Sequence, residues 1–311
     1  MKCISQIAAI CLLGLAAACS AYPATDMSEA RYVEADGVSS RVAEWGDGPP
    51  ILLIHGASST LSVFEPTVAP LLSATHRLVA YDRPGMGLSA DRPANADTLK
   101  VQAEVAAGVI DAMEMERPIV IGHSLGGAIA LRLALDHPEL VSGLVLIGAP
   151  AYEWPGSVAW HYHMSDMPLV GPVFNHVLSR PFIGGAIKSG IEGLFAPQDA
   201  PEGYLEATNT RLAAAPGALR AGARDVKSLK RELIAQAPRY PDIDQPVGIL
   251  VGVDDRVVSY ELHSRRLAET LPNARIETLS GVGHAPHEIA PQTLRALVDW
   301  VGENAEKSQE N

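Results

Sequence analysis

The chain has 311 residues, of which 47% are hydrophobic and 19% are charged, and its formal net charge is −12. This length and apolar content suffice for one large core or one domain with an insertion, and they exclude a wholly disordered chain. The negative charge argues against nucleic acid as a partner and against electrostatic binding to anionic lipid.

The first nineteen residues have the pattern of a targeting segment. Lys2 is followed by an apolar run from Ile4 to Leu15 and by three alanines before Cys19, and a run of this length is too short to span a bilayer comfortably. The segment resembles a bacterial lipoprotein leader, in which the cysteine is lipidated, although Ala16 stands where that pattern usually has leucine. An ordinary secretory leader is the alternative. We therefore expect export to the bacterial cell envelope, with a lipid anchor at Cys19, or else a soluble periplasmic or secreted protein.

All three cysteines, Cys3, Cys11 and Cys19, belong to this segment. A mature chain that starts at Cys19 has no other thiol, so neither a disulfide nor a catalytic thiol nor a cysteine metal site is expected. Residues 20–30 contain mostly small and polar side chains and are expected to form a linker.

Short apolar runs then alternate with segments of helical spacing. The pattern predicts strands at 31–35, 38–45, 51–54, 77–81, 118–121, 140–147, 247–251 and 275–279. It predicts helices at 61–72, 98–115, 125–137, 260–271 and 291–301. Asp36-Gly37 is a strong hairpin signal. The strands at 51–54, 118–121 and 247–251 have no polar side chain, as expected when helices cover both faces of a parallel sheet. The predicted fold class is α/β, with a mostly parallel central sheet flanked by helices.

The alternation stops between residues 151 and 243, where short helical stretches, prolines and glycines replace the strands. We expect this segment to be an insertion at the carboxyl edge of the sheet. The core would then comprise residues 31–150 and 244–305, with a tail at 306–311.

The pattern G-x-S-x-G occurs at Gly122-His123-Ser124-Leu125-Gly126, between a predicted strand and a predicted helix. It is typical of a strained turn that raises a serine hydroxyl to the edge of a sheet, where crowding backbone requires glycine. Further motifs follow the ends of other predicted strands: His55-Gly56, Asp82 to Ser89, Gly252-Val253-Asp254-Asp255 and Gly283-His284. With these residues the chain resembles the α/β-hydrolase superfamily, in the chain order serine, acid, histidine, over essentially all of its mature length.

The resemblance implies that Ser124 is the nucleophile. A serine hydroxyl needs a base to accept its proton as it attacks, and His284, in the loop after the last strand, is the expected base. The acid that orients the imidazole is expected to be Asp255, three residues after Gly252. Asp254 is the alternative, and would otherwise cap or solvate the turn.

The resemblance also implies an oxyanion hole formed by the backbone N–H groups of Ala57 and Leu125, the second at the N-terminus of a helix. The loop from Asp82 to Ser89 is expected to be structural, with Arg83 and Asp82 fixing it. Ser58 to Thr60 are expected to cap the helix that follows.

Other classes of site fit the residues less well. No G-K-S/T follows a glycine run, which excludes a P-loop, and Ser124 occupies the place of the middle glycine of a dinucleotide-binding motif. His161 and His163 lack a third ligand at helical spacing, so we expect a surface role for them. Neither a metal nor a cofactor is expected.

The insertion is expected to form a helical cap over the nucleophile. It contains five of the eight Trp and Phe residues of the chain, which either form its own small core or line an apolar pocket: Trp154, Trp160, Phe174, Phe182 and Phe195. No charge cluster for a phosphate or carboxylate is evident, which favours an uncharged, apolar substrate. The sequence therefore predicts a serine hydrolase that cleaves a small-molecule carboxylic ester. A thioesterase, a lactonase, a carbon–carbon bond hydrolase or a non-catalytic ligand-binding protein of the envelope is the alternative, and the oligomeric state is left open.

Overall fold

The computed structural model describes residues 30–89, 93, 95–178 and 180–309. The predicted leader at 1–19, including Cys19, and the linker up to residue 29 lie outside the described residues. From Arg31 onward the chain forms one compact unit. Within the described ranges, no helix is both long enough and apolar enough to cross a membrane.

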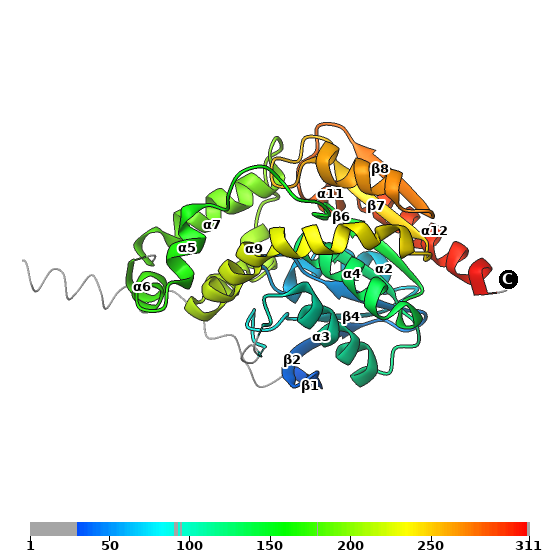
Figure 1. Ribbon diagram of the computed structural model, residues 1–311, viewed down its shortest axis with the longest axis horizontal. Coiled ribbons are helices and arrows are strands. Elements are labelled where there is room, and N and C mark those ends of the chain that lie inside the picture. The colour runs from blue at the N-terminus through cyan, green and yellow to red at the C-terminus, as the bar shows by residue number, and fades with distance from the viewer. Residues whose placement is uncertain (1–29, 90–92, 94, 179, 310–311) are drawn as a thin grey trace, which may run out of the picture. The chain divides into compact units, whose positions relative to one another are not determined.

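A single sheet of eight strands forms the centre of this unit (Figure 1). Its order is β1-β2-β4-β3-β5-β6-β7-β8, and only the pairs β1/β2 and β2/β4 are antiparallel. The strands are β1 (Arg31–Ala35), β2 (Val38–Trp45), β3 (Pro50–Ile54), β4 (Arg77–Tyr81), β5 (Ile119–His123), β6 (Gly143–Ile147), β7 (Val247–Gly252) and β8 (Ala274–Leu279). The predicted fold class, a mostly parallel sheet flanked by helices, is confirmed.

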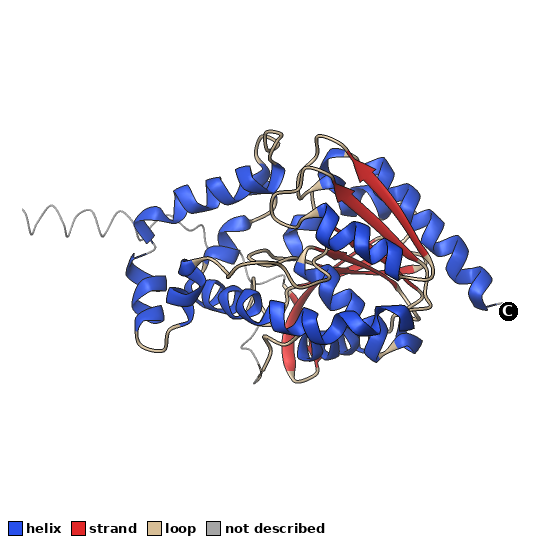
Figure 2. Cartoon of the chain, turned by 45° about the horizontal axis from the view of Figure 1, so that its top comes forward, coloured by secondary structure: helices blue, strands red, loops and turns tan. Residues whose placement is uncertain are grey.

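Alternate side chains of the central strands enter two different cores. Leu52 and Ile54 of β3 pack with helices α3 (Leu99–Ala112) and α4 (Leu125–Asp136). Ile51 and Leu53 pack on the other face with the region of α2 (Val68–Leu72) and with α12 (Pro291–Gln309). Figure 2 shows the helices on both sides of the strands. Because both faces are covered, these strands are apolar at every position rather than at every second one.

The structure corrects the bounds of several predicted elements. The predicted helix at 61–72 is broken into η2 (Leu61–Phe64) and α2, since Pro66 has no N–H to continue the hydrogen-bond ladder. The strand predicted at 140–147 begins only at Gly143, after the 3₁₀ turn η3 (Pro138–Leu140). The helix predicted at 260–271 starts with a π turn, η7 (Tyr260–Arg265), and continues as α10 (Arg266–Thr270).

The last helix is longer than predicted. It was expected to end at residue 301, with a tail at 306–311, yet α12 continues to Gln309. Buried Leu294, Leu297, Val301 and Ala305 repeat at helical spacing, so the apolar stripe runs on past the predicted end.

Between β6 and β7 the described chain is helical, and α11 (Pro286–Ile289) follows β8. The helical segment comprises α5 (Trp160–Asp166), α6 (Val170–Val173), η4 (Phe174–Leu178), α7 (Arg180–Phe195), α8 (Tyr204–Ala207), η5 (Thr210–Ala214), α9 (Pro216–Gln236) and η6 (Ala237–Asp242). Figure 1 shows α5, α6 and α7 beyond one end of the sheet, while α9 runs back across it. Leu229 and Leu233 of α9 join the main core, so this helix connects the segment to the sheet.

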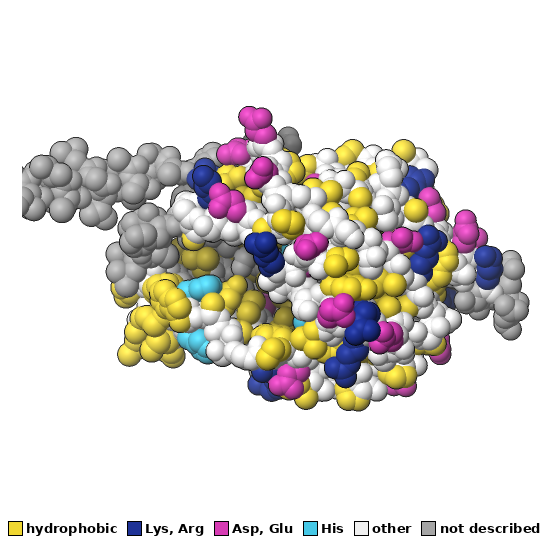
Figure 3. All heavy atoms as spheres, turned by 90° about the horizontal axis from the view of Figure 1, so that it is seen from above, with side chains coloured by type: hydrophobic (Ala, Val, Ile, Leu, Met, Phe, Trp, Pro, Cys, Tyr) yellow, Lys and Arg dark blue, Asp and Glu magenta, His cyan; other side chains and the backbone are white. Residues whose placement is uncertain are grey.

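The end of the molecule that carries α5 and α6 has an apolar surface. Trp160, Met167, Leu169 and Val173 are all exposed there, Leu169 by 89%. Figure 3 shows hydrophobic side chains gathered at this end, beside histidines.

His263 gives a pH dependence to the junction between the sheet and the helical segment. Its Nδ1 accepts the N–H groups of Ala151 and Tyr152, at 3.1 and 3.2 Å, and burial lowers its pKa from 6.5 to about 4. The unfolded chain takes up this proton near pH 6.5, whereas the folded protein does so only near pH 4. The unfolded state therefore binds more protons between these values, and stability falls as the pH drops through them.

We expect His263→Gln to make this part of the stability profile less steep. Without the imidazole, the free energy of unfolding should depend less on pH, by up to about 1.4 kcal/mol per pH unit. The measurement is urea unfolding at several pH values between pH 7 and pH 4. Thr270→Val is the matched control, because it removes the hydrogen bond between the Thr270 and Tyr152 hydroxyl groups at the same junction but no titrating group. It should lower stability without changing the slope; an equal slope in the wild type and His263→Gln would contradict the assignment.

Candidate active site

Ser124 occupies a sharp turn between β5 and α4. Its φ is +52° and its ψ is −123°, a conformation that costs a residue with a side chain about 1–3 kcal/mol. Two backbone hydrogen bonds hold the turn, from the N–H of Ser124 to Ile147 O and from the N–H of Gly127 to Ser124 O, both of 2.8 Å. The surrounding structure therefore stabilises the strained turn from both sides.

Glycines flank the turn because there is no space for a Cβ atom. A Cβ on Gly122 would lie 2.4 Å from the carbonyl oxygen of Gly126, and one on Gly126 would lie 2.0 Å from that of Ile54. These neighbours are backbone atoms, which cannot turn aside as a flexible side chain can. The G-x-S-x-G pattern is thus a steric requirement of this turn.

The structure brings Ser124, His284 and Asp255 together. His284 Nε2 lies 2.9 Å from Ser124 Oγ, and His284 Nδ1 lies 2.6 Å from Asp255 Oδ2. The other oxygen of Asp255 accepts the N–H groups of Val257 and Val258, at 2.7 and 2.8 Å. With Asp255 as the acceptor, the proton of a neutral His284 lies on Nδ1, and Nε2 is left to accept from the serine hydroxyl.

Asp254, the alternative acid, does not reach the imidazole. It is exposed, and its Oδ2 accepts the N–H of Gly281 at 2.7 Å. It therefore connects the turn after β7 to the loop that precedes His284.

Ala57 and Leu125, the expected oxyanion donors, both belong to segments beside Ser124. Leu125 is the first residue of α4, and the first N–H groups of a helix have no acceptor within it. Ala57 follows β3, which pairs with β5, and no acceptor within the described residues takes its N–H. Gly56 is close enough to the turn that a Cβ on it would lie 3.1 Å from the Cβ of Ser124.

A family model described as "Alpha/beta hydrolase family" matches residues 51–298. The chain belongs to this family. The resemblance inferred from the sequence motifs is thereby confirmed.

Several known proteins are similar to this α/β-hydrolase. It is 33% identical over 261 residues to the magnesium-chelatase 30 kDa subunit of Rhodobacter capsulatus. This alignment covers 82% of this chain and 87% of the relative. It is 28% identical over 270 residues to 2-hydroxymuconate semialdehyde hydrolase of Pseudomonas putida, with coverages of 82% and 87%. The crystal structure of an alpha/beta hydrolase fold protein from Burkholderia ambifaria has a TM-score of 0.73 at 26% identity, covering 86% and 96%. Solved structures that share the fold at 22–24% identity include an esterase from Exiguobacterium antarcticum, an N-acyl homoserine lactone degrading enzyme and a meta-cleavage product hydrolase from Pseudomonas fluorescens.

The backbone of His284 is held from two directions. Its N–H donates to Leu194 O of α7 at 2.9 Å, and its carbonyl oxygen lies 3.0 Å from His123 Nε2. Burial lowers the pKa of His123 to about 4, so the ring is neutral near pH 7 and donates from Nε2. One contact comes from the helical segment and the other from the turn of Ser124.

The loop from Asp82 to Ser89 has the structural role that its sequence predicted, with one difference. Asp82 accepts the N–H groups of Leu61 and Leu88, at 2.8 and 2.9 Å. Arg83 does not pair with Asp82: it forms an ion pair of 2.8 Å with Asp225 of α9, and both side chains are fully buried. Among the three residues expected to cap a helix, Thr60 accepts the N–H of Ser62 at the start of η2.

Asp225 and Gly148 are residues of the site region that the sequence interpretation missed. Asp225 had a visible signal, since it continues the helical spacing of Ala218, Ala221 and Leu229 and so places a carboxylate in a buried stripe. Gly148 follows β6 with φ +53°, and a Cβ there would lie 3.0 Å from His284 Nδ1 and 3.5 Å from Asp255 Oδ2. Nothing local in the sequence shows that contact.

The aromatic side chains of the helical segment have different environments. Phe195 is buried against Tyr204 and Ala285, next to His284, whereas Trp160 is 68% exposed and Phe182 is outside the residues whose side chains are described. His163 is also exposed, and the described residues contain no group of three or more His, Cys, Asp or Glu that could hold a metal ion.

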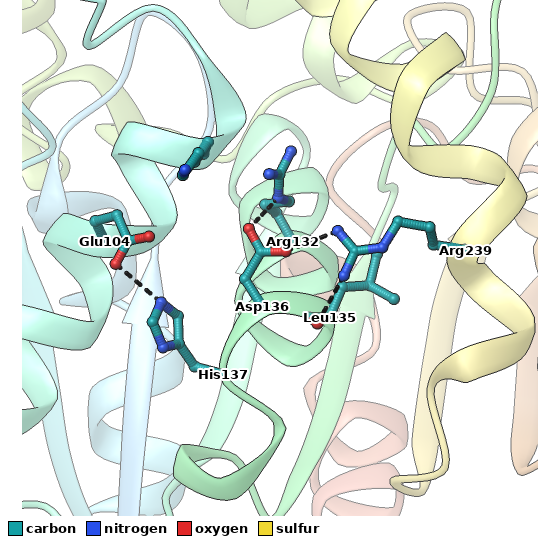
Figure 4. A pocket seen from close by; sticks show the side chains of 7 residues that line it. Glu104, Arg132, Leu135, Asp136, His137 and Arg239 are labelled. Atoms are coloured by element: carbon teal, nitrogen blue, oxygen red, sulfur yellow. Dashed lines mark hydrogen bonds and ion pairs between the residues drawn. The ribbon is translucent and has the colours of Figure 1, made fainter.

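A polar hollow of about 350 Å³ lies at the other end of α4, roughly 18 Å from Ser124 by the rise of the helix (Figure 4). In it Arg239 donates to Asp136 and to Leu135 O, the last turn of α4, and His137 contacts Glu104. These contacts satisfy the end of the helix and connect it to η6 and α3. The hollow is separate from the candidate active site.

Gly148→Ala should disturb the contact between His284 and Asp255. An alanine at positive φ costs about 1–2 kcal/mol, and its Cβ also presses on the His284 ring. We expect a lower melting temperature and an upfield shift of the proton signal of the His284–Asp255 hydrogen bond in ¹H NMR. Gly281→Ala is the control, since φ there is +72° with no atom within 4 Å of the added Cβ: it should lose stability and keep the signal. Identical spectra of both variants would refute the steric role of Gly148.

Proposed function

We propose that the protein is a serine hydrolase that cleaves a carboxylic ester through an acyl-enzyme. The observation that carries the proposal is the continuous chain from Ser124 Oγ to His284, at 2.9 Å, and from His284 to Asp255, at 2.6 Å. A base within hydrogen-bond distance of a hydroxyl, and itself oriented by a carboxylate, is the arrangement that activates a serine.

In the first half of the reaction Ser124 Oγ attacks the ester carbonyl carbon while its proton passes to His284 Nε2. Asp255 stabilises the resulting imidazolium through Nδ1. The N–H groups of Ala57 and Leu125 donate to the oxyanion, and the N-terminus of α4 favours negative charge there. The tetrahedral intermediate then collapses, and the alcohol leaves with the proton from Nε2.

In the second half a water molecule replaces the alcohol. His284 removes its proton as the water oxygen attacks the acyl carbonyl carbon, and the same two N–H groups stabilise the second tetrahedral intermediate. Collapse returns the proton to Ser124 Oγ and releases the carboxylic acid. The strained turn at Ser124 is present throughout, so no reorganisation of the backbone is required.

An uncharged, apolar substrate fits the charges of the helical segment. Asp166 of α5 accepts from Arg224 and Lys227 of α9, each at 2.7 Å, and the charge of Arg83 is balanced by Asp225. These cations already have anionic partners, so binding a substrate carboxylate to them would require breaking an existing pair.

Carbon–carbon bond hydrolysis is the second candidate, because of the similarity to the semialdehyde hydrolase of Pseudomonas putida. Parallel assays with p-nitrophenyl esters of increasing chain length, a thioester, a lactone and a 2-hydroxy-6-oxodienoate decide between these activities. The highest kcat/KM for the dienoate would replace the ester proposal.

Labelling with a fluorophosphonate probe tests the proposal directly. We expect one adduct, at Ser124, and none in Ser124→Ala. His284→Ala should lower kcat for p-nitrophenyl butyrate by about 10³-fold or more, since the base and the serine act as a unit. Asp255→Asn should lower kcat strongly. The matched variant Asp254→Asn should retain activity, because the Asp254 carboxylate accepts from the Gly281 N–H and not from the His284 imidazole.

A non-catalytic ligand-binding protein of the cell envelope is the rival from another class. Folded wild-type protein that neither reacts with the probe nor hydrolyses any substrate of the panel would support that rival and overturn the proposed function.

We also propose that the protein is exported and anchored by a lipid on Cys19. The support is the sequence of residues 1–19 alone, with its apolar run and the small residues before the cysteine. Cells grown with a palmitate analogue should incorporate it into the wild type and not into Cys19→Ser. Labelling that persists in Cys19→Ser would disprove the anchor, and an unlabelled but cleaved wild type would indicate a secretory leader.

A further inference from the structure

Arg83 is a fully buried cation that the steps above do not use. Its guanidinium donates to four acceptors from three parts of the chain: His55 O at 3.1 Å, Gly56 O at 3.0 Å, Gln102 Oε1 at 2.7 Å and Asp225 Oδ2 at 2.8 Å. The planar fork of an arginine can hold several acceptors in fixed directions. Two of them are the carbonyl groups directly before Ala57.

The carbonyl group of Gly56 accepts a second hydrogen bond, from the His55 ring. His55 Nε2 accepts the backbone N–H of Arg83 at 3.0 Å, so the proton of the neutral ring lies on Nδ1, which donates to Gly56 O at 2.9 Å. Burial and the charge of Arg83 lower the pKa of His55, which keeps the ring neutral. The oxygen of Gly56 is therefore fixed by two donors.

Fixing this oxygen also fixes the N–H of Ala57. The two groups belong to one planar trans peptide, in which the C=O and N–H bonds point in opposite directions. The peptide passes beside the nucleophile, since a Cβ on Gly56 would lie 3.1 Å from that of Ser124. Donation to Gly56 O also polarises the peptide and makes its N–H a better donor.

The charge of Arg83 is balanced from the helical segment. Asp225 on α9 accepts from Arg83, and its other oxygen accepts from Gln102 at 3.1 Å. A buried arginine without a counter-charge is strongly unfavourable. The same helix lies against the loop after β3, where a Cβ on Gly222 would be 3.5 Å from Ser58 Oγ. The guanidinium is thus paired only while α9 lies on the core.

We propose that Arg83 is a positioning residue that directs the Ala57 N–H at the oxyanion, and that Asp225 makes this arrangement dependent on the docking of α9. The inference rests on the proposed function, in which that N–H stabilises a tetrahedral intermediate. The helical segment then contributes to the chemistry through the Asp225–Arg83–Gly56 contacts without touching the substrate at these residues.

Arg83→Lys is the first test, because lysine keeps the charge but cannot hold both carbonyl groups and Asp225. We expect kcat for a p-nitrophenyl ester to fall about 10²-fold, the loss typical of removing one oxyanion donor, with KM nearly unchanged. The affinity of a trifluoromethyl ketone, whose adduct with Ser124 carries a tetrahedral oxyanion, should fall by the same factor. Asp225→Asn keeps the shape but not the charge and should show a smaller loss of both quantities.

Ser228→Ala is the matched control. Ser228 also lies on α9, and its hydroxyl donates to Asp97 O and to the backbone carbonyl of Asp225. The variant therefore loses a contact between α9 and the core while the side chains of Asp225 and Arg83 stay unchanged. It should lower the melting temperature and leave kcat and ketone affinity unchanged. If Arg83→Lys and Asp225→Asn do the same, Arg83 is only structural and the inference is overturned.

A readout independent of turnover separates this inference from the proposed function. In a crystal structure of Arg83→Lys, or of Asp225→Asn where the first variant does not fold, the Gly56–Ala57 peptide should be rotated relative to the wild type. An unrotated peptide overturns the positioning role. Wild-type protein that fails to react with the fluorophosphonate overturns the proposed function instead.

Discussion

Main-chain atoms from β3, β5 and α4 come into direct contact around Ser124, because Gly122 and Gly126 lack the Cβ atoms that would separate them. The serine at this contact has a positive φ of +52°. The start of α4 and the loop after β3 both lie beside this serine. The other parts of the site are arranged around that fixed point, since His284, Asp255 and the Gly56–Ala57 peptide must all reach the same few ångströms. The strain at Ser124 is compatible with a stable fold because the large apolar cores on both faces of the sheet hold its neighbours.

Much of this arrangement follows from short-range sequence. The central strands were predictable because their residues are apolar on both faces. Their ends mark the carboxyl edge where the motifs gather. The resemblance to the α/β-hydrolase superfamily, with its order serine, acid, histidine, then identified Ser124, Asp255 and His284. The structure brings these three residues together. The choice between Asp254 and Asp255 followed from spacing after Gly252: the strand ends there, and the following turn directs one carboxylate inward and the other to solvent. A short sequence motif was sufficient to predict a site residue wherever its position depends on only a few neighbouring residues.

Other features depend on contacts that no local pattern records. Arg83 and Asp225 are 142 positions apart, so the expectation that Arg83 would fix its own loop with Asp82 missed the partner on α9. Gly148 matters because of side chains that come from two later loops. Helix propensity and tertiary packing together determine where the helix breaks at Pro66 and where α12 ends. The periodicity of apolar residues locates such helix boundaries only poorly. In each case the deciding interaction is tertiary.

The hydrogen bond from the His284 N–H to Leu194 O has a consequence for evolution and engineering. It joins the imidazole's backbone to the end of α7, so residues 151–243 are not an interchangeable module. A chimaera that received this segment from a relative would need a carbonyl group at the place of Leu194 and a carboxylate at the place of Asp225. Without them the graft could fold and still misplace the histidine. Diversification of substrate range is therefore freest at the far end of the segment, around α5 and α6, where the described residues make no such hydrogen bond to the sheet's carboxyl edge.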